Sequence, residues 1–571
     1  MTMRKLLDLT WLGLVLFLAV GAVATLWWPW GRDQSAMAFI GHLIVEGKMP
    51  YRDAMDINSP GGYLLHALLE KVVGPARWPL RLMDLGLLLS ASWALFALGK
   101  ALHSPRAGRW AAVIFVLSYW STGFWNTAQR DGWAAMLFLW GLTVTCAGSG
   151  PSTEGKTRWG PLWARAGTAG LLVGLATLMK PLYVVLALPM GVWVVEQWRP
   201  GAQASGQLED GNTAPLGPGR YSPWAALTAG LLGLVLPLGA VLVWLARGGA
   251  LRPAYEQVVL FNRQVYASAS TGQVGLPATC LLFVDRLAQQ PILVLLALAG
   301  AGYLLGARVR GRWAVAVAWP IVATAILLYQ RRLFPYQWHS LTLWLSLLGG
   351  IGLAEIMFTK APELVPSMAS SRPWVRRVAL LALIPLLFLP VLRTARSVKW
   401  WGSDIIVRRD YARYLRHFDQ GTDFLPGTNI QVGAYLASHS GPTDTFFQCG
   451  LQPDFHLYSG RDPASPVSSW MLATTAASPD LHKKLLGQLM EDLERNRPLY
   501  FVVVDKDTNP IMPRTSAQAL RDEPVLDRYV RQYYQEEIKI GDCQLLRRRQ
   551  NRTMADVAYE GQSAIGLRDD G

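Results

Sequence analysis

Residues 9–30 read LTWLGLVLFLAVGAVATLWWPW, and residues 31–62 continue as GRDQSAMAFIGHLIVEGKMPYRDAMDINSPGG. The first stretch has about 22 mostly apolar residues, enough for a helix to cross roughly 30 Å of hydrocarbon, and its closing tryptophans are typical of a membrane interface. The second stretch, called the first loop below, places acidic residues directly after this span, beginning with Asp33. We therefore predict a membrane anchor followed by an acidic loop on the water side.

The composition extends this prediction to most of the chain. The 571 residues are 51% hydrophobic and include 25 tryptophans, which is too apolar for an ordinary soluble enzyme. Apolar runs of about 17 to 25 residues predict about eleven membrane spans. After 9–30 these lie near 80–100, 109–129, 131–148, 164–179, 181–198, 223–246, 289–307, 312–330, 338–358 and 378–395. The short pair that meets at Lys180 and Pro181 is equally compatible with a re-entrant hairpin.

The net charge of +15 would suit a nucleic-acid partner, but its distribution along the chain argues against one. Lysine and arginine collect in alternate loops, which the positive-inside rule assigns to the cytoplasm. The first loop and everything after about residue 396 are then outside. We expect a multi-pass protein of the inner (plasma) membrane that binds membrane lipids and no nucleic acid, with the first span retained as an anchor.

The apolar runs end near residue 396, which divides the chain into a transmembrane part, 1–395, and a soluble extracytoplasmic part, 396–571. In the second part, 499–504 and 443–449 have the pattern of strands, whereas 478–497 and 428–438 have the pattern of helices. The predicted fold is a polytopic α-helical membrane protein with a C-terminal α/β domain. Cys449 and Cys543 both fall in that domain, and the sequence leaves a disulfide between them open.

Unusual polar residues gather at the outer ends of the predicted spans. They are Asp33, Asp53 and Asp56 in the first loop, Arg130 and Asp131, Lys180, Arg263, and Arg331, Arg332, Tyr336 and His339. Both signs of charge on one side indicate an anionic ligand beside a catalytic carboxylate. A lipid that carries a phosphate fits that description.

Asp33 and Asp131 are the catalytic candidates. An ionised Asp33 could remove a proton from an acceptor hydroxyl, but it could equally be the N-cap of a helix over 34–46. Asp131 could orient a sugar or a cation, or it could cap its own helix and pair with Arg130. Lys180 lies between two apolar segments, so its ammonium must reach the interface, find a partner or bind a phosphate. For His339 the alternative to a substrate contact is an interhelical hydrogen bond.

Several short segments follow one another along the chain in an order known from one family. They are DQ at 33–34, GKMPYRD at 47–53, NSPG at 58–61, QRD at 129–131, GLLVGLATLMKP at 170–181, RLFPY at 332–336, FQCG at 447–450 and LYSGR at 457–461. In order and topology the chain resembles the GT-C polyprenyl-phosphate-sugar glycosyltransferases, specifically the bacterial relatives of protein O-mannosyltransferases and the lipid A aminoarabinose transferase. The resemblance covers most of the chain.

The resemblance implies an inverting transfer in which Asp33 deprotonates the acceptor while the lipid phosphate leaves the anomeric carbon. Basic side chains would stabilise the charge of the departing phosphate. The residues assigned to the donor and its phosphate are Arg130, Lys180, Arg332, Tyr336 and His339.

The chain also departs from the family pattern in the first loop. Gln34 replaces the glutamate of the common Asp-Glu pair, and the segment from Asn58 to Pro60 lacks the lysine that precedes proline in aminoarabinose transferases. Neither relative's acceptor is therefore carried over to this chain. The residues assigned to the acceptor or the loop are Gln34, Asp53, Asp56 and Asn58.

The leading hypothesis is a membrane glycosyltransferase that moves a sugar from a polyprenyl-phosphate donor to a glycan, lipid or protein acceptor on the extracytoplasmic side. The alternative is a flippase or transporter of lipid-linked sugars, which should place ionisable residues near the middle of the bilayer. A sensor or scaffold would leave the first-loop carboxylates and Lys180 unexplained. The sequence has no strong metal-binding motif and no Walker A motif, so we expect no required cofactor, and a divalent cation stays open.

Overall fold

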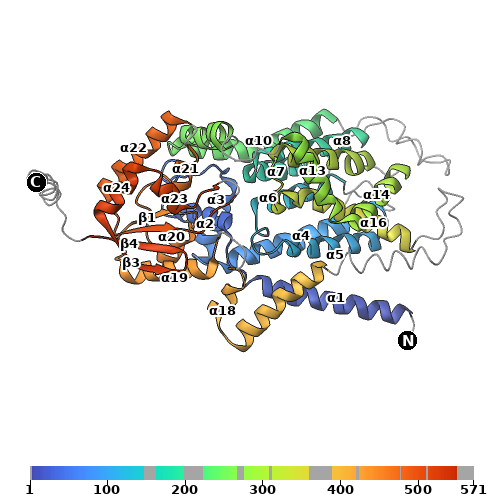
Figure 1. The fold of residues 1–571 in the computed structure, drawn as a ribbon. Helices are drawn as coiled ribbons and strands as arrows, with labels where there is room; N and C mark the ends of the chain where they lie inside the picture. The colour runs from blue at the N-terminus through green and yellow to red at the C-terminus, as the bar shows by residue number, and fades with distance from the viewer. Residues whose placement is uncertain are drawn as a thin grey trace, which may run out of the picture. The chain divides into compact units, whose positions relative to one another are not determined.

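The chain folds into two compact units, which are described separately. The computed structural model describes residues 3–146, 162–197, 223–266, 275–307, 311–358, 389–419, 424–475, 478–509 and 512–549 (Figure 1). The helical unit comprises Met1–Trp30, Asn58–Leu251 and Val274–Tyr411. The sheet unit comprises Gly31–Ile57, Arg252–Gln273 and Ala412–Gly571, so most of the first loop is grouped with the C-terminal part of the chain.

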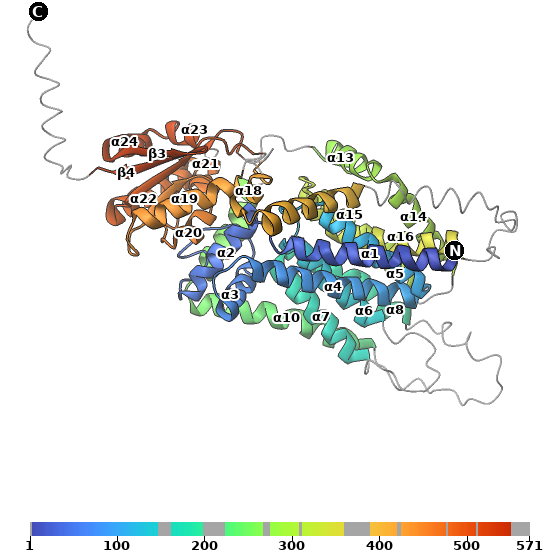
Figure 2. The same ribbon diagram turned by 90° about the horizontal axis from the view of Figure 1, so that it is seen from below.

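The helical unit consists of long apolar helices joined by short breaks. Its elements are α1 (Met3–Thr25), α3 (Gly61–Val73), α4 (Trp78–Leu102), α5 (Pro105–Ser121), α6 (Arg130–Cys146), α7 (Leu162–Met179), the 3-10 helix η1 (Pro181–Leu186), α8 (Ala187–Gln197), α10 (Pro223–Arg247), α13 (Leu276–Ala288), α14 (Pro291–Gly306), the π-helix η3 (Ala314–Ala318), α15 (Trp319–Gln330), the 3-10 helix η4 (Pro335–Trp338), α16 (His339–Phe358) and the π-helix η6 (Trp401–Val407). Helices α4, α5 and α16 pack side by side (Figure 2).

Four helices among the described residues are long and apolar enough to cross a membrane, and a fifth span results if the bent pair α13 and α14 counts as one. The two helices of that pair meet at 92°. Shorter apolar helices cover Leu12–Thr25, Pro181–Glu196 and Ala314–Gln330. The chain is thus a mainly helical, membrane-type protein, and the count of eleven spans stays a prediction. Most of the predicted span 378–395 lies outside the described residues, and its end continues as a helix over 389–400.

Close backbone approach holds the helices of this unit together. A Cβ at Gly170 on α7 would overlap the carbonyl oxygen of Gly230 on α10, and a Cβ at Gly352 on α16 would overlap the carbonyl oxygen of Leu296 on α14. Small residues at such crossings let membrane helices approach closely, because helix association in lipid depends on packing rather than on the exclusion of water.

The sheet unit has three layers, with helices on both faces of a four-stranded sheet (Figure 1). The strand order is β1-β2-β4-β3, with β1 and β2 parallel and the other neighbours antiparallel. Its elements are α2 (Arg32–Val45), α11 (Leu251–Ala254), the π-helix η2 (Tyr255–Tyr266), α18 (Tyr411–Arg416), α19 (Pro426–His439), β1 (Phe446–Cys449), α20 (Asp454–Ser459), α21 (Ser469–Thr474), α22 (Pro479–Asn496), β2 (Tyr500–Val504), α23 (Ser516–Arg521), α24 (Pro524–Tyr533), β3 (Tyr534–Ile540) and β4 (Cys543–Arg548); α11 and α18 lie at its boundaries.

Alternate side chains of the central strands point to opposite faces of the sheet and form the two hydrophobic cores of this unit. On β2, Phe501 and Val503 pack with α22, α23 and α24, whereas Tyr500 and Val502 pack with α19 and α20 on the opposite face. Every residue of β2 is buried, as expected for a strand covered on both sides. The order of layers therefore follows from the short apolar run that the sequence presents at 499–504.

The observed elements match the C-terminal predictions within a few residues, with two differences. The sequence analysis did not predict the antiparallel pair β3 and β4, which supplies half of the sheet. The disulfide left open between Cys449 and Cys543 is absent, because both cysteines are free and buried.

Candidate functional site

Lys180 occupies a break between helices in the helical unit. Helix α7 ends at Met179, Lys180 adopts an extended conformation with φ −153° and ψ 114°, and Pro181 begins η1. Proline disfavours a helical residue before it, so the Lys-Pro pair itself produces the break. The side chain of Lys180 is only 15% exposed, and its position therefore depends on the groups around it.

The ammonium of Lys180 is held by two oxygen acceptors from other helices. Its Nζ donates hydrogen bonds to a carboxylate oxygen of Asp131 and to the side-chain oxygen of Gln330. Asp131 is fully buried in the first turn of α6, and Gln330 is the last residue of α15. A buried charge is tolerated when an opposite charge and hydrogen bonds compensate for lost water. Three helix ends thus meet around one ion pair.

Asp131 keeps one oxygen without a hydrogen bond inside this cluster. Its Oδ2 is buried without a hydrogen-bond partner, and the Nε of Arg130 lies 4.0 Å from it. The hydroxyl of Tyr183, also buried and without a hydrogen-bond partner, lies within electrostatic range of Asp131. Tyr183 was not among the predicted site residues, although its place three residues after Lys180 was a usable signal. The expected pair of Arg130 and Asp131 has a longer separation than the pair of Lys180 and Asp131, which is also hydrogen-bonded.

A second buried network supports the segment that leads to α6. Asp84 accepts hydrogen bonds from the hydroxyl of Tyr119 at 2.6 Å and from Nε1 of Trp133 at 2.9 Å. Arg81, 2% exposed, donates to the carbonyl of Phe124 at 3.1 Å and to other groups around it. Neither Arg81 nor Asp84 was predicted as a functional residue, although each interrupts the apolar run 80–100, where a charged residue needs a partner.

The other predicted donor residues lie around the break before α16. His339 is 1% exposed, and its Nε2 donates to the carbonyl oxygen of Asn126 at 2.9 Å. Asn126 lies in the turn before α6, so His339 is hydrogen-bonded, as in the alternative to a substrate contact, but to a turn and not to another helix. Tyr336 is half-buried and stacks on Phe334 with ring centroids 5.6 Å apart. Arg332 is half-buried in the same segment. Their roles toward a donor stay predictions.

The end of the first loop contacts the break at Lys180. The hydroxyl of Ser59 donates to the carbonyl oxygen of Met179 at 2.6 Å. A Cβ at Gly61 would come within 2.7 Å of the Met179 backbone nitrogen, so only glycine fits this approach. The carbonyl of Asn58 accepts from the hydroxyl of Tyr63 at 3.2 Å. The NSPG and MKP segments, about 120 residues apart, therefore form one local structure.

Asp33 is not the N-cap of its helix, which corrects one of the two sequence interpretations. Helix α2 begins at Arg32 with Gly31 as the N-cap, and the side-chain oxygen of Gln34 accepts from the backbone nitrogen of Gly31 at 2.8 Å. Asp33 is half-buried in the first turn. Gln34 thus performs the capping, and a carboxylate in the first turn is favoured by the helix dipole.

The remaining acidic residues of the first loop have partners within the sheet unit. Asp53 accepts from Arg52 at 2.7 and 2.8 Å and from the backbone nitrogen of Met49 at 2.7 Å. The hydrogen bond from Arg52 is the main cause that lowers the pKa of Asp53 below its usual range. Asp56 is buried, and its backbone nitrogen donates to the side chain of Gln257 at 3.0 Å. Asp53 thus has contacts that hold the loop in shape.

The predicted site residues divide between the two units. Asp33, Gln34, Asp53 and Asp56 belong to the sheet unit, and Asn58, Arg130, Asp131, Lys180, Arg332, Tyr336 and His339 belong to the helical unit. The structure brings Lys180 and Asp131 together, with Arg130 beside them. Within the described part of the chain, no group of three or more His, Cys, Asp or Glu side chains is placed to hold a metal ion.

Solved structures that match this chain are GT-C glycosyltransferases, and this chain has the GT-C fold. No family model matches the sequence, and no curated protein matches it. The fold assignment therefore comes from solved structures.

Two of these structures are of ArnT from Cupriavidus metallidurans. The form bound to undecaprenyl phosphate is 13% identical with a TM-score of 0.56, and the apo form is 14% identical with a TM-score of 0.53. In each case the match covers 94% of this chain and 98% of the other. The Archaeoglobus fulgidus oligosaccharyltransferase in its apo form matches over 86% of this chain and 69% of that one, at 14% identity and a TM-score of 0.44. At these identities the likeness to the two ArnT structures establishes the fold alone.

Proposed function

We propose that this chain is an integral membrane glycosyltransferase that moves a sugar from a polyprenyl-phosphate donor to an acceptor on the extracytoplasmic side. The observation that carries the proposal is the buried ammonium of Lys180 at a helix break, paired with Asp131 and Gln330, in a chain with the GT-C fold. The ArnT structure with the same fold is bound to undecaprenyl phosphate. A lipid of that class is the donor type we assign here.

Lys180 suits the stabilisation of a departing phosphate. Transfer converts a phosphodiester with one negative charge into a monoester with up to two, so the transition state gains charge at the phosphate oxygens. A fixed ammonium in a low-dielectric surrounding stabilises such charge strongly, because it needs little reorganisation. Asp131 orients Lys180, and Arg130 supplies a second positive charge. Arg332, Tyr336 and His339 would contact the rest of the donor.

Asp33 is the proposed general base of an inverting reaction. The acceptor hydroxyl oxygen forms a bond to the anomeric carbon on the face opposite the phosphate, and its proton passes to the Asp33 carboxylate. The bond from the anomeric carbon to the phosphate oxygen breaks, and the electron pair leaves with the polyprenyl phosphate. The first turn of α2 favours the ionised carboxylate that this step requires.

The position of the ion pair favours a transferase over the alternative, a flippase or transporter. Lys180 follows the last residue of α7, Asp131 lies in the first turn of α6, and Gln330 ends α15. A transporter should instead hold its ionisable residues near the middle of the spans, with access from both sides. The proposal assigns the outer side of the inner membrane to these helix ends, to the first loop and to residues 396–571.

The experiment compares a deletion strain with strains complemented by variants of the full-length chain. Mass spectrometry of surface glycans and envelope lipids should show one missing sugar in the deletion strain and accumulation of the unconsumed polyprenyl-phosphate sugar. Asp33→Asn should fail to restore the product, although the purified variant retains binding of undecaprenyl phosphate. Asp480→Asn is the matched control, because Asp480 also lies in the first turn of a helix, α22, and is exposed. Restoration of product by Asp33→Asn would remove Asp33 as the base, and an unchanged envelope in the deletion strain would remove the transferase.

A further inference from the structure

Helix α2, which carries Asp33, is fastened to the rest of the sheet unit along one face. Arg32 donates from Nε to the carbonyl oxygen of Leu451 at 3.1 Å, and its guanidinium lies 5.7 Å from the ring centroid of Phe424. Phe39 stacks on His456 with centroids 4.7 Å apart. Residues seven apart lie on the same face of a helix. Two side chains, two turns apart, therefore fix the rotation of α2 about its axis.

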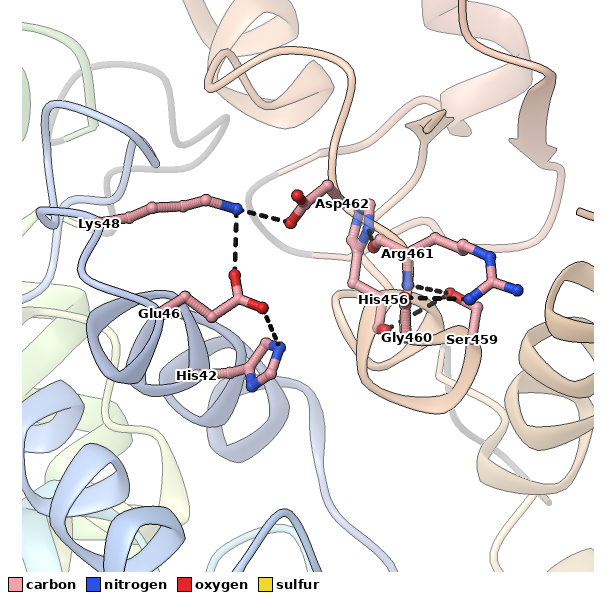
Figure 3. A network of polar contacts seen from close by, with 8 residues as sticks. All are labelled: His42, Glu46, Lys48, His456, Ser459, Gly460, Arg461 and Asp462. Carbon is pink, nitrogen blue, oxygen red and sulfur yellow. Dashed lines mark hydrogen bonds and ion pairs between the residues drawn. The ribbon is translucent and has the colours of Figure 1, made fainter. Parts of the chain in front are cut away.

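His456 carries the second of these contacts into the sheet. Its opposite side stacks on Phe446 of β1 at 4.1 Å, and its Nδ1 donates to the carbonyl oxygen of Arg461 at 2.9 Å (Figure 3). Burial lowers the pKa of His456 to about 4, so the ring is neutral at physiological pH. The Arg461 side chain donates in turn to the carbonyl of Ser440 at 2.7 Å. Phe39 thus rests on a ring that is itself held from two sides.

Lys48, three residues beyond the end of α2, makes a further contact with the same region. It donates to Asp462 at 2.7 Å and to Glu46 at 3.1 Å, and Glu46 lies 3.3 Å from Nε2 of His42 (Figure 3). These side chains are 31–52% exposed, so the ion pairs contribute little stability. Their effect is to restrict the direction in which the chain leaves α2, whereas Arg32 and Phe39 restrict its rotation.

Small rotations of α2 matter because Asp33 follows Arg32 directly. An atom about 5 Å from a helix axis moves about 1 Å when the helix turns by about 10°. A misplacement of about 1 Å at a reacting group can reduce a rate by roughly 100-fold. The orientation of Asp33 is therefore as sensitive to the contacts of Arg32 and Phe39 as to anything in its own side chain.

We propose that Arg32, supported by Phe39, is a positioning residue for the general base, and that the C-terminal sheet domain holds α2 in its working orientation through these two side chains. This inference rests on the proposed function of Asp33. It assigns to the domain a role in the rate of the chemical step. Binding of the donor does not depend on this role.

The test uses purified full-length variants added to membranes of the deletion strain, which contain the acceptor, with increasing amounts of that strain's lipid extract as the donor. Arg32→Gln should reduce the maximal rate by about tenfold or more and leave the half-saturating amount of extract within about twofold. Arg32→Lys, which keeps a donor and a cation, should recover most of the rate. Phe39→Leu should lower the rate in the same sense. Val45→Ala, at the exposed end of α2, is the matched control and should match the unmodified chain.

A second measurement reads the position of α2 without a substrate. Amide hydrogen exchange over residues 32–46 should be faster in Arg32→Gln and Phe39→Leu than in Val45→Ala. A rise in the half-saturating amount for Arg32→Gln at an unchanged maximal rate would make Arg32 a donor contact and overturn the inference. The inference would also be overturned if Arg32→Gln and Phe39→Leu both transferred sugar at the rate of the unmodified chain while Asp33→Asn was inactive. An active Asp33→Asn would instead refute the assigned base, and the exchange data would still show whether Arg32 and Phe39 hold the helix.

Discussion

Replacement of one or both members of the Lys180–Asp131 pair separates its structural role from its role in transfer. Asp131 has no exposed surface and Lys180 is 15% exposed, so each single replacement leaves a buried charge without its partner. Breaking a buried pair in this way costs about 3–5 kcal/mol, whereas replacing both members by neutral groups of similar size is often close to neutral. Lys180→Met and Asp131→Asn should each be strongly destabilising, and the double variant should regain most of the loss.

Transfer should follow a different pattern from stability. If the ammonium of Lys180 stabilises the departing phosphate, its loss should cost about 100-fold or more in rate, the size expected for one preorganised electrostatic contact. The double variant has no ammonium, so it should fold and still fail to transfer. If the Lys180–Asp131 pair served only the fold, the double variant would regain both its stability and its transfer activity.

The assay follows unfolding of each purified variant by tryptophan fluorescence and transfer by product mass in the complemented deletion strain. Arg252→Met is the matched control, because Arg252 forms an exposed pair with Glu256 at 2.9 Å and its loss should cost less than about 1 kcal/mol. Unmodified transfer by the stable double variant would refute the phosphate role of Lys180. Full stability of Lys180→Met alone would refute the buried pair itself.

Three further predictions concern packing, pH and redox state. Gly61→Ala should destabilise the purified chain by about 1–3 kcal/mol, because the new Cβ would overlap the backbone of α7, whereas Gly86→Ala, with open space around it, should be neutral or slightly stabilising in thermal unfolding. Burial lowers the pKa of His456 from an ordinary 6.5 to about 4, so the unfolded chain binds the proton at a higher pH than the folded chain does. The neutral ring therefore contributes its full share to folding stability above about pH 6.5 and loses that share as the pH falls toward 4. The loss in the free energy of unfolding is about 2 kcal/mol by pH 5. Amide exchange of α20 should show that loss, and His456→Phe, which keeps the stacked ring, should show less of it. Cys449 and Cys543 should react with a thiol reagent only after unfolding, in equal measure with and without prior reduction, since both are free and buried.

The positions of several helices in the membrane unit could be predicted from the sequence, because their hydropathy and length are sufficient signals. The predicted span 223–246 corresponds to α10 at Pro223–Arg247, and 164–179 corresponds to α7 at Leu162–Met179. The bend of 92° between α13 and α14 could not be read in the same way. The apolar content of a segment does not record its direction, because direction is set by packing against helices that are distant in sequence.

The N-terminus of α2 shows that a helix start predicted from sequence can be wrong by one or two residues, and that such a shift changes the assigned cap. In a capping box the N-cap and the Glu or Gln at N3 act together, so a shift of the helix start by one or two residues changes which side chain does the capping. Here the start at Arg32 gives the cap to Gln34 and leaves Asp33 in the first turn. Gln34, noted first as a departure from the family pattern, is thus explained by local backbone geometry.

The sheet shows which strands could be predicted from local sequence and which could not, because they depend on pairing with distant segments. Strand β2 could be predicted because it is buried on both faces and continuously apolar. Strand β3, with the pattern YQEEIKI, is largely exposed, so its hydrophobic signal is weak, and the clearest sign of it was the Gly541-Asp542 turn that joins it to β4. Packing of the first loop with the C-terminal domain had no local signal at all.

The second departure from the family pattern, at Asn58 to Pro60, has a structural explanation that bears on the phosphate site. The hydroxyl of Ser59 satisfies the carbonyl of Met179 at the end of α7, where a helix leaves its last carbonyls without partners. Gly61 lets the same two segments touch. A lysine in this segment would add charge, whereas the residues present instead fix the backbone that carries Lys180. The proposed function then takes the positive charge for a departing phosphate from Lys180 at the α7 break and from Arg130, whereas Ser59 and Gly61 of the first loop fix the backbone at that break.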